Sequence, residues 1–321
     1  LIDKEENEER KMELIKETDY YFKRAEELSP KRQEIYIEWA KTAMVSRDFQ
    51  KMKERSLICR DLNPNLFDCY WSWGLSEIFL GNLKEGKKDA LETLKLFSKL
   101  KYPKFEKFRE YFALKGTSYF STIDLIACKG KVCIPINHYE KHFREYFKQG
   151  STSEFAVEGQ ESYMVGALAR IINNKELISK ENQPYIEIIE KNIYNPYMNI
   201  LAQAIEVYEG IKRCIEVIEN LNLKQESLPA IKPKKAVGFG ASEAPRGILF
   251  HKYEFDNNGF STFVNITTPT TQNLQNIEDN IKALLPSLLN ENKDKIQLEV
   301  EKLIRAYDPC ISCATHFLEI I

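Results

Sequence analysis

The stretch "GASEAPRGILFHKYEFDNNGFSTFVNITTPTTQN", residues 240–273, decides how the second half of the chain folds. It predicts a loop, a strand, a turn, a second strand and the start of a helix, in that order. The turn is "DNNG", Asp256 to Gly259, because asparagine and glycine tolerate the backbone angles of a tight turn. Helical patterns before and after this antiparallel piece predict an α+β domain.

Two shorter motifs inside this stretch carry polar side chains that could serve chemistry. In "EAPRG", Arg246 stands between Pro245 and Gly247, so its backbone is restrained while its guanidinium projects. Such an arginine, taken alone, is more often a structural ion-pair partner. In "TPTTQN", hydroxyl and amide groups gather before a helix, and the simplest interpretation is an N-cap formed by Thr270 or Thr271.

Composition limits the classes of protein to which the chain can belong. Its 321 residues suffice for one large or two ordinary domains, and 29% charged with 43% hydrophobic residues is a soluble globular balance. The net charge of −2 does not favour binding to nucleic acid or to an anionic membrane. No stretch approaches the ~20 apolar residues of a membrane span, and no signal-peptide pattern is seen.

The seven cysteines are an odd number at irregular spacing, which is not the pattern of a disulfide framework. A reducing cytoplasm is the simplest expectation, and it would keep Cys310 and Cys313 as thiolates available to a metal. The densest set of soft ligands is "CISCATH", in which Cys310, Cys313 and His316 stand three apart.

A zinc site, a redox dithiol and half of a larger metal centre are the alternatives that "CISCATH" leaves open. Zinc usually takes a second close-spaced pair, and Cys128 and Cys133 match that pattern poorly. A thioredoxin-like dithiol would open a helix inside a βαβ unit, and the sequence shows no such unit.

The first hundred residues predict helices almost throughout, and their pattern repeats with a period of 34 residues. Pro30 and Pro64 keep this distance, and so do the predicted turns between helices at Asp48 and Asn82. Residues from about 14 to 98 therefore resemble a short tetratricopeptide array, in which helix pairs stack on one another. Aromatic residues that share the period are expected in its core rather than in a peptide-binding groove. These are Tyr36, Trp39, Tyr70 and Trp73.

The chain is accordingly expected to be mainly α. Residues 1–105 would form tetratricopeptide-like helical repeats, and residues 106–321 would form the α+β domain. In this second part a hairpin is predicted around Lys129 and Gly130, because glycine accepts a positive φ. Periodicity predicts further helices at residues 162–173, 199–220, 272–289 and 299–306.

The order of "EAPRGILFHKYEFDNNG", "TPTTQN" and "RAYDPCISCATH" resembles that in the large subunit of nickel–iron hydrogenases. "YMVGALARI" (163–171) and "NPYMNILAQAIEVYEGI" (195–211) fit the same family. The resemblance runs from Glu110 to Ile321 and is closest to the soluble, cytoplasmic, NAD(P)-linked type. His316 argues against the complex-I-like membrane hydrogenases, which usually have arginine there, and the retained cysteines argue against the respiratory-complex relatives.

The resemblance implies a centre in which thiolates join nickel to an iron that carries carbon monoxide and cyanide. Cys310 would be a terminal nickel ligand, and Cys313 would bridge nickel and iron. His316 would lie beside an outer cation such as magnesium. Soft thiolates hold low-valent nickel, so the chemistry needs cysteine at these positions.

The same resemblance assigns polar residues around the metals. Arg246 would hang over the open metal position and help to polarise hydrogen or take its proton, with Pro245 and Asp308 lining the same canopy. Thr270 would hydrogen-bond a cyanide ligand. A cation and hydrogen-bond donors steady anionic diatomic ligands in a dry pocket.

The function implied is that of a hydrogenase, an oxidoreductase that oxidises or evolves H2. Electrons would pass through an iron–sulfur small subunit, and NAD(P)-reducing subunits would carry them to a soluble acceptor such as NAD(P). A maturation endopeptidase would remove the tail "FLEII" after nickel insertion. The alternative function is a tetratricopeptide interaction module with a vestigial hydrogenase segment.

One feature of the family is missing from the sequence. The family takes half of its metal ligands from an N-terminal "RxCxxC" stretch, which this chain lacks, so the isolated chain is expected to be inactive. Either another polypeptide supplies those ligands, or the chain is a chimera of two unrelated gene fragments. The missing initial methionine and the change of sequence texture near residue 105 favour the chimera.

Overall fold

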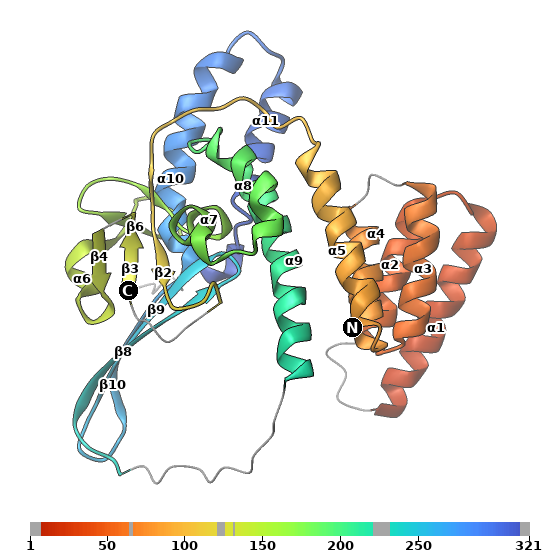
Figure 1. Cartoon of the computed structure of the whole chain (residues 1–321), viewed down its shortest axis with the longest axis horizontal. Coiled ribbons are helices and arrows are strands. Elements are labelled where there is room, and N and C mark those ends of the chain that lie inside the picture. The colour runs from red at the N-terminus through yellow and green to blue at the C-terminus, as the bar shows by residue number, and fades with distance from the viewer. Residues whose placement is uncertain (1–7, 64–66, 121–125, 131, 221–231, 315–321) are drawn as a thin grey trace. The chain divides into compact units, whose positions relative to one another are not determined.

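The computed structural model describes residues 8–63, 67–120, 126–130, 132–220 and 232–314 (Figure 1). The chain divides into two compact units. The first contains Leu1–Leu100 and Val207–Asn222, and the second contains Lys101–Glu206 and Leu223–Ile321. The first boundary lies close to the predicted residue 105. The assignment of 207–222 to the first unit differs from the prediction, because the two ends of the long helix α9 (Met198–Glu219) fall in different units.

The first unit is built from helices that each pack against the next along the chain. α2 and α4 begin 34 residues apart, and so do α3 and α5, which is the period expected from the sequence. The Asp48 carboxylate caps α3 by accepting a hydrogen bond from the Lys51 amide. Membership of the tetratricopeptide family stays a prediction. Besides the end of α9, the helices are α1 (Glu8–Leu28), α2 (Gln33–Val45), α3 (Phe49–Leu62), α4 (Phe67–Phe79) and α5 (Leu83–Ser98).

The core of this unit contains Tyr36 and Trp39, both buried as predicted, whereas Tyr70 and Trp73 are only half-buried. It also contains Cys59 and Cys69, which are fully buried and joined by a disulfide with a Cα–Cα distance of 5.6 Å. The sequence pattern did not predict this disulfide. α3 and α4 pack against each other, so the end of one lies beside the start of the next, which the cysteine count could not indicate.

The second unit combines helices with short sheets. β8, β9 and β10 form an antiparallel sheet, β2, β3 and β4 form another, β5 pairs with β6, and β1 runs parallel to β7. The strands are β1 (Glu110–Tyr111), β2 (Ala113–Lys115), β3 (Ile126–Lys129), β4 (Val132–Pro135), β5 (Phe143–Phe147), β6 (Glu154–Glu158), β7 (Tyr163–Met164), β8 (Ala236–Ala244), β9 (Gly247–Phe255) and β10 (Ser261–Thr267). Besides the start of α9, the helices are α6 (Tyr139–His142), α7 (Ala167–Asn174), α8 (Gln183–Glu190), α10 (Pro269–Leu284) and α11 (Lys293–Ala306).

The β8–β10 sheet is the long ribbon in Figure 1 and carries the motif at residues 243–247 in one of its turns. The predicted hairpin between β9 and β10 is confirmed, and the Asp256 carboxylate closes it by accepting from the amides of Asn258 and Phe260. The loop predicted before β9 was wrong, because residues 236–244 form strand β8 along β9. Gly238 and Gly240 interrupt the apolar alternation of β8, so its strand character comes from pairing rather than from local pattern.

The core of the second unit joins its sheets. Tyr139 stacks on Phe250 with ring centroids 4.6 Å apart, and Phe112 meets Tyr163 edge to face at 5.3 Å. These contacts tie β9 to the segments around β2, β5 and β7. Within the described part of the chain, no helix combines the length and apolar character needed to cross a membrane. The core residues are Phe112, Leu114, Ile134, Ile136, Tyr139, Phe143, Tyr163, Val165, Ile248 and Phe250.

Candidate metal centre

Arg246 is presented by the tight turn between β8 and β9. Ala244 pairs with Gly247, which leaves Pro245 and Arg246 as the two turn residues. Gly247 has φ +136, and a Cβ atom there would lie 2.4 Å from a methyl carbon of Val165. Only glycine fits this position, because both the backbone angle and the neighbouring side chain exclude a Cβ. The turn is therefore pressed against the segment that leads into α7.

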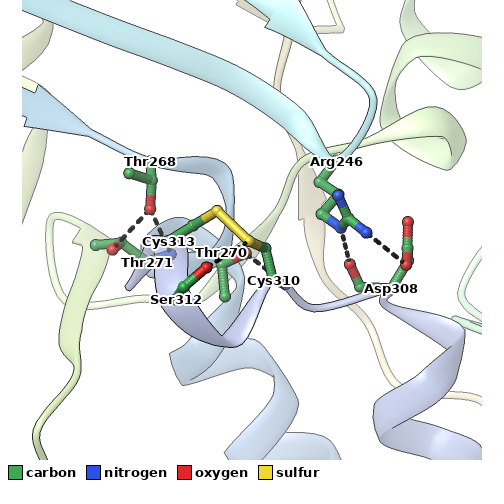
Figure 2. The surroundings of a disulfide bond; sticks show 8 residues. All are labelled: Arg246, Thr268, Thr270, Thr271, Asp308, Cys310, Ser312 and Cys313. Carbon is green, nitrogen blue, oxygen red and sulfur yellow. Dashed lines mark hydrogen bonds and ion pairs between the residues drawn. A yellow bond between two sulfur atoms is a disulfide. The ribbon is translucent and has the colours of Figure 1, made fainter. Parts of the chain in front are cut away.

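The guanidinium of Arg246 is bound to Asp308, on the loop between α11 and the two cysteines. Its Nε donates to the Asp308 backbone oxygen, and one Nη donates to the Asp308 carboxylate at 3.1 Å (Figure 2). Asp308 has φ +50, a left-handed angle that aspartate tolerates better than most residues. The two side chains keep 38% and 41% of their surface exposed, so the ion pair contributes only about 0–1 kcal/mol of stability. The ion pair therefore matters for where the Arg246 guanidinium lies rather than for stability.

Cys310 and Cys313 lie on a single 3-10 turn, Ile311–Cys313, directly after this loop. The Cys313 amide donates to the Cys310 carbonyl at 3.1 Å, and the two sulfurs are joined in a disulfide with a Cα–Cα distance of 5.3 Å. Both sulfurs therefore point to the same place. The expectation that both cysteines are thiolates was wrong for this structure, because the 3-10 turn brings their sulfurs within bonding distance. After reduction, two thiolates in this arrangement can bind one metal ion.

Thr270 connects the cysteine turn to the first turn of α10. Its Oγ1 accepts a hydrogen bond of 3.1 Å from the Cys310 amide, which leaves its own hydroxyl proton for another acceptor. The N-cap of α10 is Thr268, whose Oγ1 accepts from the Thr271 amide, so the prediction of Thr270 or Thr271 was wrong. Figure 2 shows this turn beside the cysteines. A helix N-terminus favours negative charge, and thiolates bring such charge.

The structure thus joins four predicted site residues by direct hydrogen bonds or sequence adjacency: Arg246, Asp308, Cys310 and Thr270. Pro245 lies in the same turn as Arg246, and Cys313 faces Cys310. His316 and the tail that follows it lie outside the described residues. Among the residues that the structure describes, no group of three or more His, Cys, Asp or Glu could hold a metal. The two sulfurs fit half of a four-thiolate centre, and the described residues do not supply the other half.

Sequence reasoning missed a buried ion cluster behind the turn. Arg170 on α7 is 6% exposed and pairs with Glu206 at 2.6 Å and with Glu243 at 2.8 Å. Burial raises the pKa of Glu243 above its usual value, although Arg170 opposes this effect. The one local signal was an arginine inside the apolar stretch "VGALARII", since buried arginines need acceptors.

A second cluster of buried polar side chains surrounds Tyr307, directly after α11 and before the cysteine turn. The Tyr307 hydroxyl donates to the Asn276 side-chain oxygen and accepts from Asn280 and, at 3.4 Å, from Arg109. Burial raises the pKa of Tyr307 to about 12, so the hydroxyl stays protonated at neutral pH. Tyr307, the residue before Asp308, is thereby fixed to Asn276 and Asn280 on α10.

Comparison with known proteins concerns the part of the chain that contains this site. Residues 160–316, which contain Arg170, Arg246, Thr270 and both cysteines of the turn, match the nickel-dependent hydrogenase family. This part of the chain is a nickel-dependent hydrogenase large-subunit domain, and the chain is homologous to hydrogenase alpha subunits.

Individual relatives can be named. The chain is 31% identical to sulfhydrogenase 1 subunit alpha of Pyrococcus furiosus over 245 residues, 74% of this chain and 57% of that one. It is 32% identical to the NAD-reducing hydrogenase HoxS subunit beta of Cupriavidus necator over 196 residues, 56% of this chain and 40% of that one. The chain therefore spans about half the length of these relatives.

The fold is similar to that of a solved NAD+-reducing [NiFe]-hydrogenase in its H2-reduced state. The TM-score is 0.63 with 19% identity, and the match covers 85% of this chain and 70% of that chain. A likeness at this level of identity concerns the fold alone.

Proposed function

We propose that this chain is a segment of a nickel–iron hydrogenase large subunit that takes part in the reversible oxidation of H2. The observation that carries the proposal is the convergence of Cys310 and Cys313 beside Thr270 and Arg246, within the region that matches the hydrogenase family. The Arg246 guanidinium bound to Asp308, two positions before Cys310, supports this proposal over a zinc site or a redox dithiol.

Cys310 and Cys313 would supply two thiolate ligands of a nickel–iron centre that carries carbon monoxide and cyanide. When bound, this group supplies the place at which the H–H bond breaks into two protons and two electrons. Thr270 would donate its free hydroxyl proton to an anionic diatomic ligand. A magnesium ion near His316 belongs to the same proposal.

Arg246 and Asp308 would take part in removing the proton that is released at the metal centre. The Arg246 fork holds Oδ1 of Asp308, and the other oxygen, Oδ2, lies 3.3 Å from the Gln203 amide, a weak contact. Oδ2 is the atom that we assign as the first proton acceptor. Arg246 keeps its positive charge throughout, because a guanidinium does not release its proton in proteins.

The electrons would leave through an iron–sulfur small subunit to a soluble acceptor. NAD(P)-reducing subunits are the proposed further partners, supported by the name of the Cupriavidus relative, an NAD-reducing hydrogenase. A maturation endopeptidase is a proposed transient partner. We propose a cytoplasmic location, because the two cysteines act as ligands only when reduced.

Metal analysis tests the proposal. The chain is produced in a host with hydrogenase maturation enzymes, once alone and once with a polypeptide that carries the family's "RxCxxC" stretch. Nickel, iron and H2-dependent dye reduction are then measured. We expect neither metal nor activity in the chain alone, since two thiolates leave the metal open to exchange. Stoichiometric nickel and iron in the single chain would contradict the need for a second ligand pair.

A second candidate function, a protein-interaction module, is favoured by the helix starts of the first unit that repeat every 34 residues. The double substitution Cys310→Ser and Cys313→Ser separates the two candidates. It abolishes a metal-dependent activity and leaves an interaction role intact. H2-dependent dye reduction in the parent chain supplied with the "RxCxxC" polypeptide, and its loss in this variant, would support the hydrogenase function, whereas its absence from the parent would support the interaction role.

A further inference from the structure

We propose that Arg170 is the positioning residue that fixes the Pro245–Arg246 turn and thereby directs Arg246 toward Asp308. The inference rests on the proposed function in one respect only, namely that Arg246 is directed toward a metal position. The contacts that carry it are made entirely within this chain.

Every N–H group of the Arg170 guanidinium has an acceptor. Nε donates to Glu206 Oε1 at 2.6 Å, and Nη2 donates to Glu206 Oε2 at 2.7 Å. Nη1 donates to Glu243 Oε2 at 2.8 Å and to the Ala244 carbonyl at 2.9 Å. Nη2 also donates to the Pro245 carbonyl at 2.9 Å. A guanidinium has five such donors, so none is left unused.

Two of these acceptors are the carbonyls of the residues directly before Arg246. Ala244 and Pro245 form the end of β8 and the first half of the turn, and Arg170 holds both oxygens at once. Only a planar fork can bind a carboxylate in bidentate fashion and reach two neighbouring carbonyls. Lysine keeps the charge and offers three donors from a single atom, so it cannot reproduce the contact set.

The two carboxylates are themselves held from the other side. The Tyr119 hydroxyl donates to Glu206 Oε1 at 2.7 Å, and the Leu114 amide donates to Glu243 Oε1 at 2.7 Å. Arg170 therefore connects the turn to β2 and to α9 through groups that cannot move freely. Loss of Arg170 would leave two buried carboxylates without their cation.

The same helix supports the opposite side of the turn. Gly166 precedes α7, and its carbonyl accepts from the Arg170 amide at 2.9 Å. A Cβ atom on Gly166, which has φ +116, would lie 3.1 Å from the Arg246 carbonyl oxygen. The backbone of Arg246 thus rests on Gly166 while Arg170 holds the two carbonyls before it.

Arg246 cannot fix its own direction. Its ion pair with Asp308 is more than a third exposed, and such pairs contribute about 0–1 kcal/mol, too little to hold a long side chain in one place. Its orientation therefore depends on the turn, and the turn depends on Arg170.

Nuclear magnetic resonance of the full, metal-free chain labelled with 15N-arginine tests this inference. The Nε–H signal of Arg246 is assigned by its disappearance in Arg246→Lys. We expect this signal to be protected from exchange with water in the parent chain, because Nε donates to the Asp308 carbonyl. In Arg170→Lys we expect the protection to be lost, so that the Arg246 Nε–H exchanges with water as fast as the Nε–H groups of exposed arginines.

Ile186→Ala is the control for loss of stability. Ile186 is 1% exposed and lies on α8, which carries none of the contacts to the turn or to Asp308 described above. Its substitution leaves a cavity in the same domain, and the Arg246 signal should stay protected. Unchanged protection in Arg170→Lys, or equal loss in Ile186→Ala, would overturn the inference.

A further variant covers the case in which Arg170→Lys does not fold. Glu206→Gln removes one charge behind Arg170 and leaves the turn untouched, so we expect a partial loss of Arg246 protection, and full protection would count against the inference. The measurement needs neither nickel nor hydrogen. A chain that never binds nickel can therefore still confirm the role of Arg170, and an active hydrogenase can still refute it.

Discussion

Arg246 donates two hydrogen bonds to one residue, Asp308, the first to its backbone oxygen and the second to its carboxylate. Asp308 lies two positions before Cys310 and has a left-handed backbone angle. The side chain of a β-turn therefore contacts the residue at the entry to the cysteine turn at two points. Changes at Arg246 should affect the placement of a carboxylate as well as the local charge.

In an enzyme reconstituted with its metals, Arg246→Lys should lower turnover on the order of 10²-fold, the loss typical of a preorganised donor. Metal content should stay near normal, because both cysteines and the Thr270 contact are retained. H2-dependent dye reduction and metal analysis measure the two effects. Arg213→Lys is the control, since Arg213 is exposed and pairs with Glu216 on its own helix. An unchanged rate would mean that Arg246 is only structural.

The Thr270 hydroxyl is expected to protect the Cys310 amide. Thr270→Val removes the acceptor and leaves a part-buried N–H unpaired, at a cost of about 1–3 kcal/mol, whereas Thr270→Ser keeps it. Hydrogen–deuterium exchange of the peptide that contains Cys310 reports this bond directly. Exchange should be faster in the valine variant and close to the parent in the serine variant. Identical protection in all three proteins would show that the bond does not exist in solution.

Features with a local cause were predictable from the sequence. Asp48 and Asn82 lie directly before α3 and α5, where the Asp48 side chain caps α3 and Asn82 marks a turn without a side-chain cap. The hairpin between β9 and β10 was predictable because Asp256 closes it within four residues. The cysteine turn was recognised because Cys310 and Cys313 are close in the sequence.

Features that depend on distant partners were not predictable. β8 is a strand because it pairs with β9, although Gly238 and Gly240 weaken its local pattern. Arg170 meets Glu206 and Glu243, which stand 36 and 73 positions further along the chain. No period or spacing in the sequence connects such residues, and only the folded chain brings them together.

The Cys59–Cys69 disulfide should stabilise the first unit. Closing a loop with a sequence separation of 10 removes chain entropy worth about 3 kcal/mol. All three tryptophans, Trp39, Trp71 and Trp73, lie in this unit, so tryptophan fluorescence follows its unfolding alone. Reductant should lower the urea midpoint of the parent and leave that of the double variant Cys59→Ala, Cys69→Ala unchanged. A parent midpoint insensitive to reductant would contradict a stabilising disulfide.

Asp89 should make the stability of the same unit depend on pH. Its side chain is 1% exposed, and its Oδ2 has no hydrogen-bond partner among the residues that the structure describes. Burial, together with the nearby Glu77 carboxylate, raises the pKa of Asp89 to about 7 from 3.8. Between these two values the folded unit binds a proton that the unfolded chain has released. The free energy of unfolding therefore falls as the pH rises from about 4 to 7.

Asp89→Asn should remove this dependence, because the amide cannot ionise in either state. We expect the variant to match the parent near pH 4 and to exceed its urea midpoint at pH 8, with tryptophan fluorescence as the readout. Glu92→Gln on the exposed side of α5 is the control and should follow the parent at both pH values. A parent midpoint that rises between pH 5 and pH 8 while Asp89→Asn stays level would reverse the sign argued here. It would mean that Asp89 is ionised and paired in the folded chain.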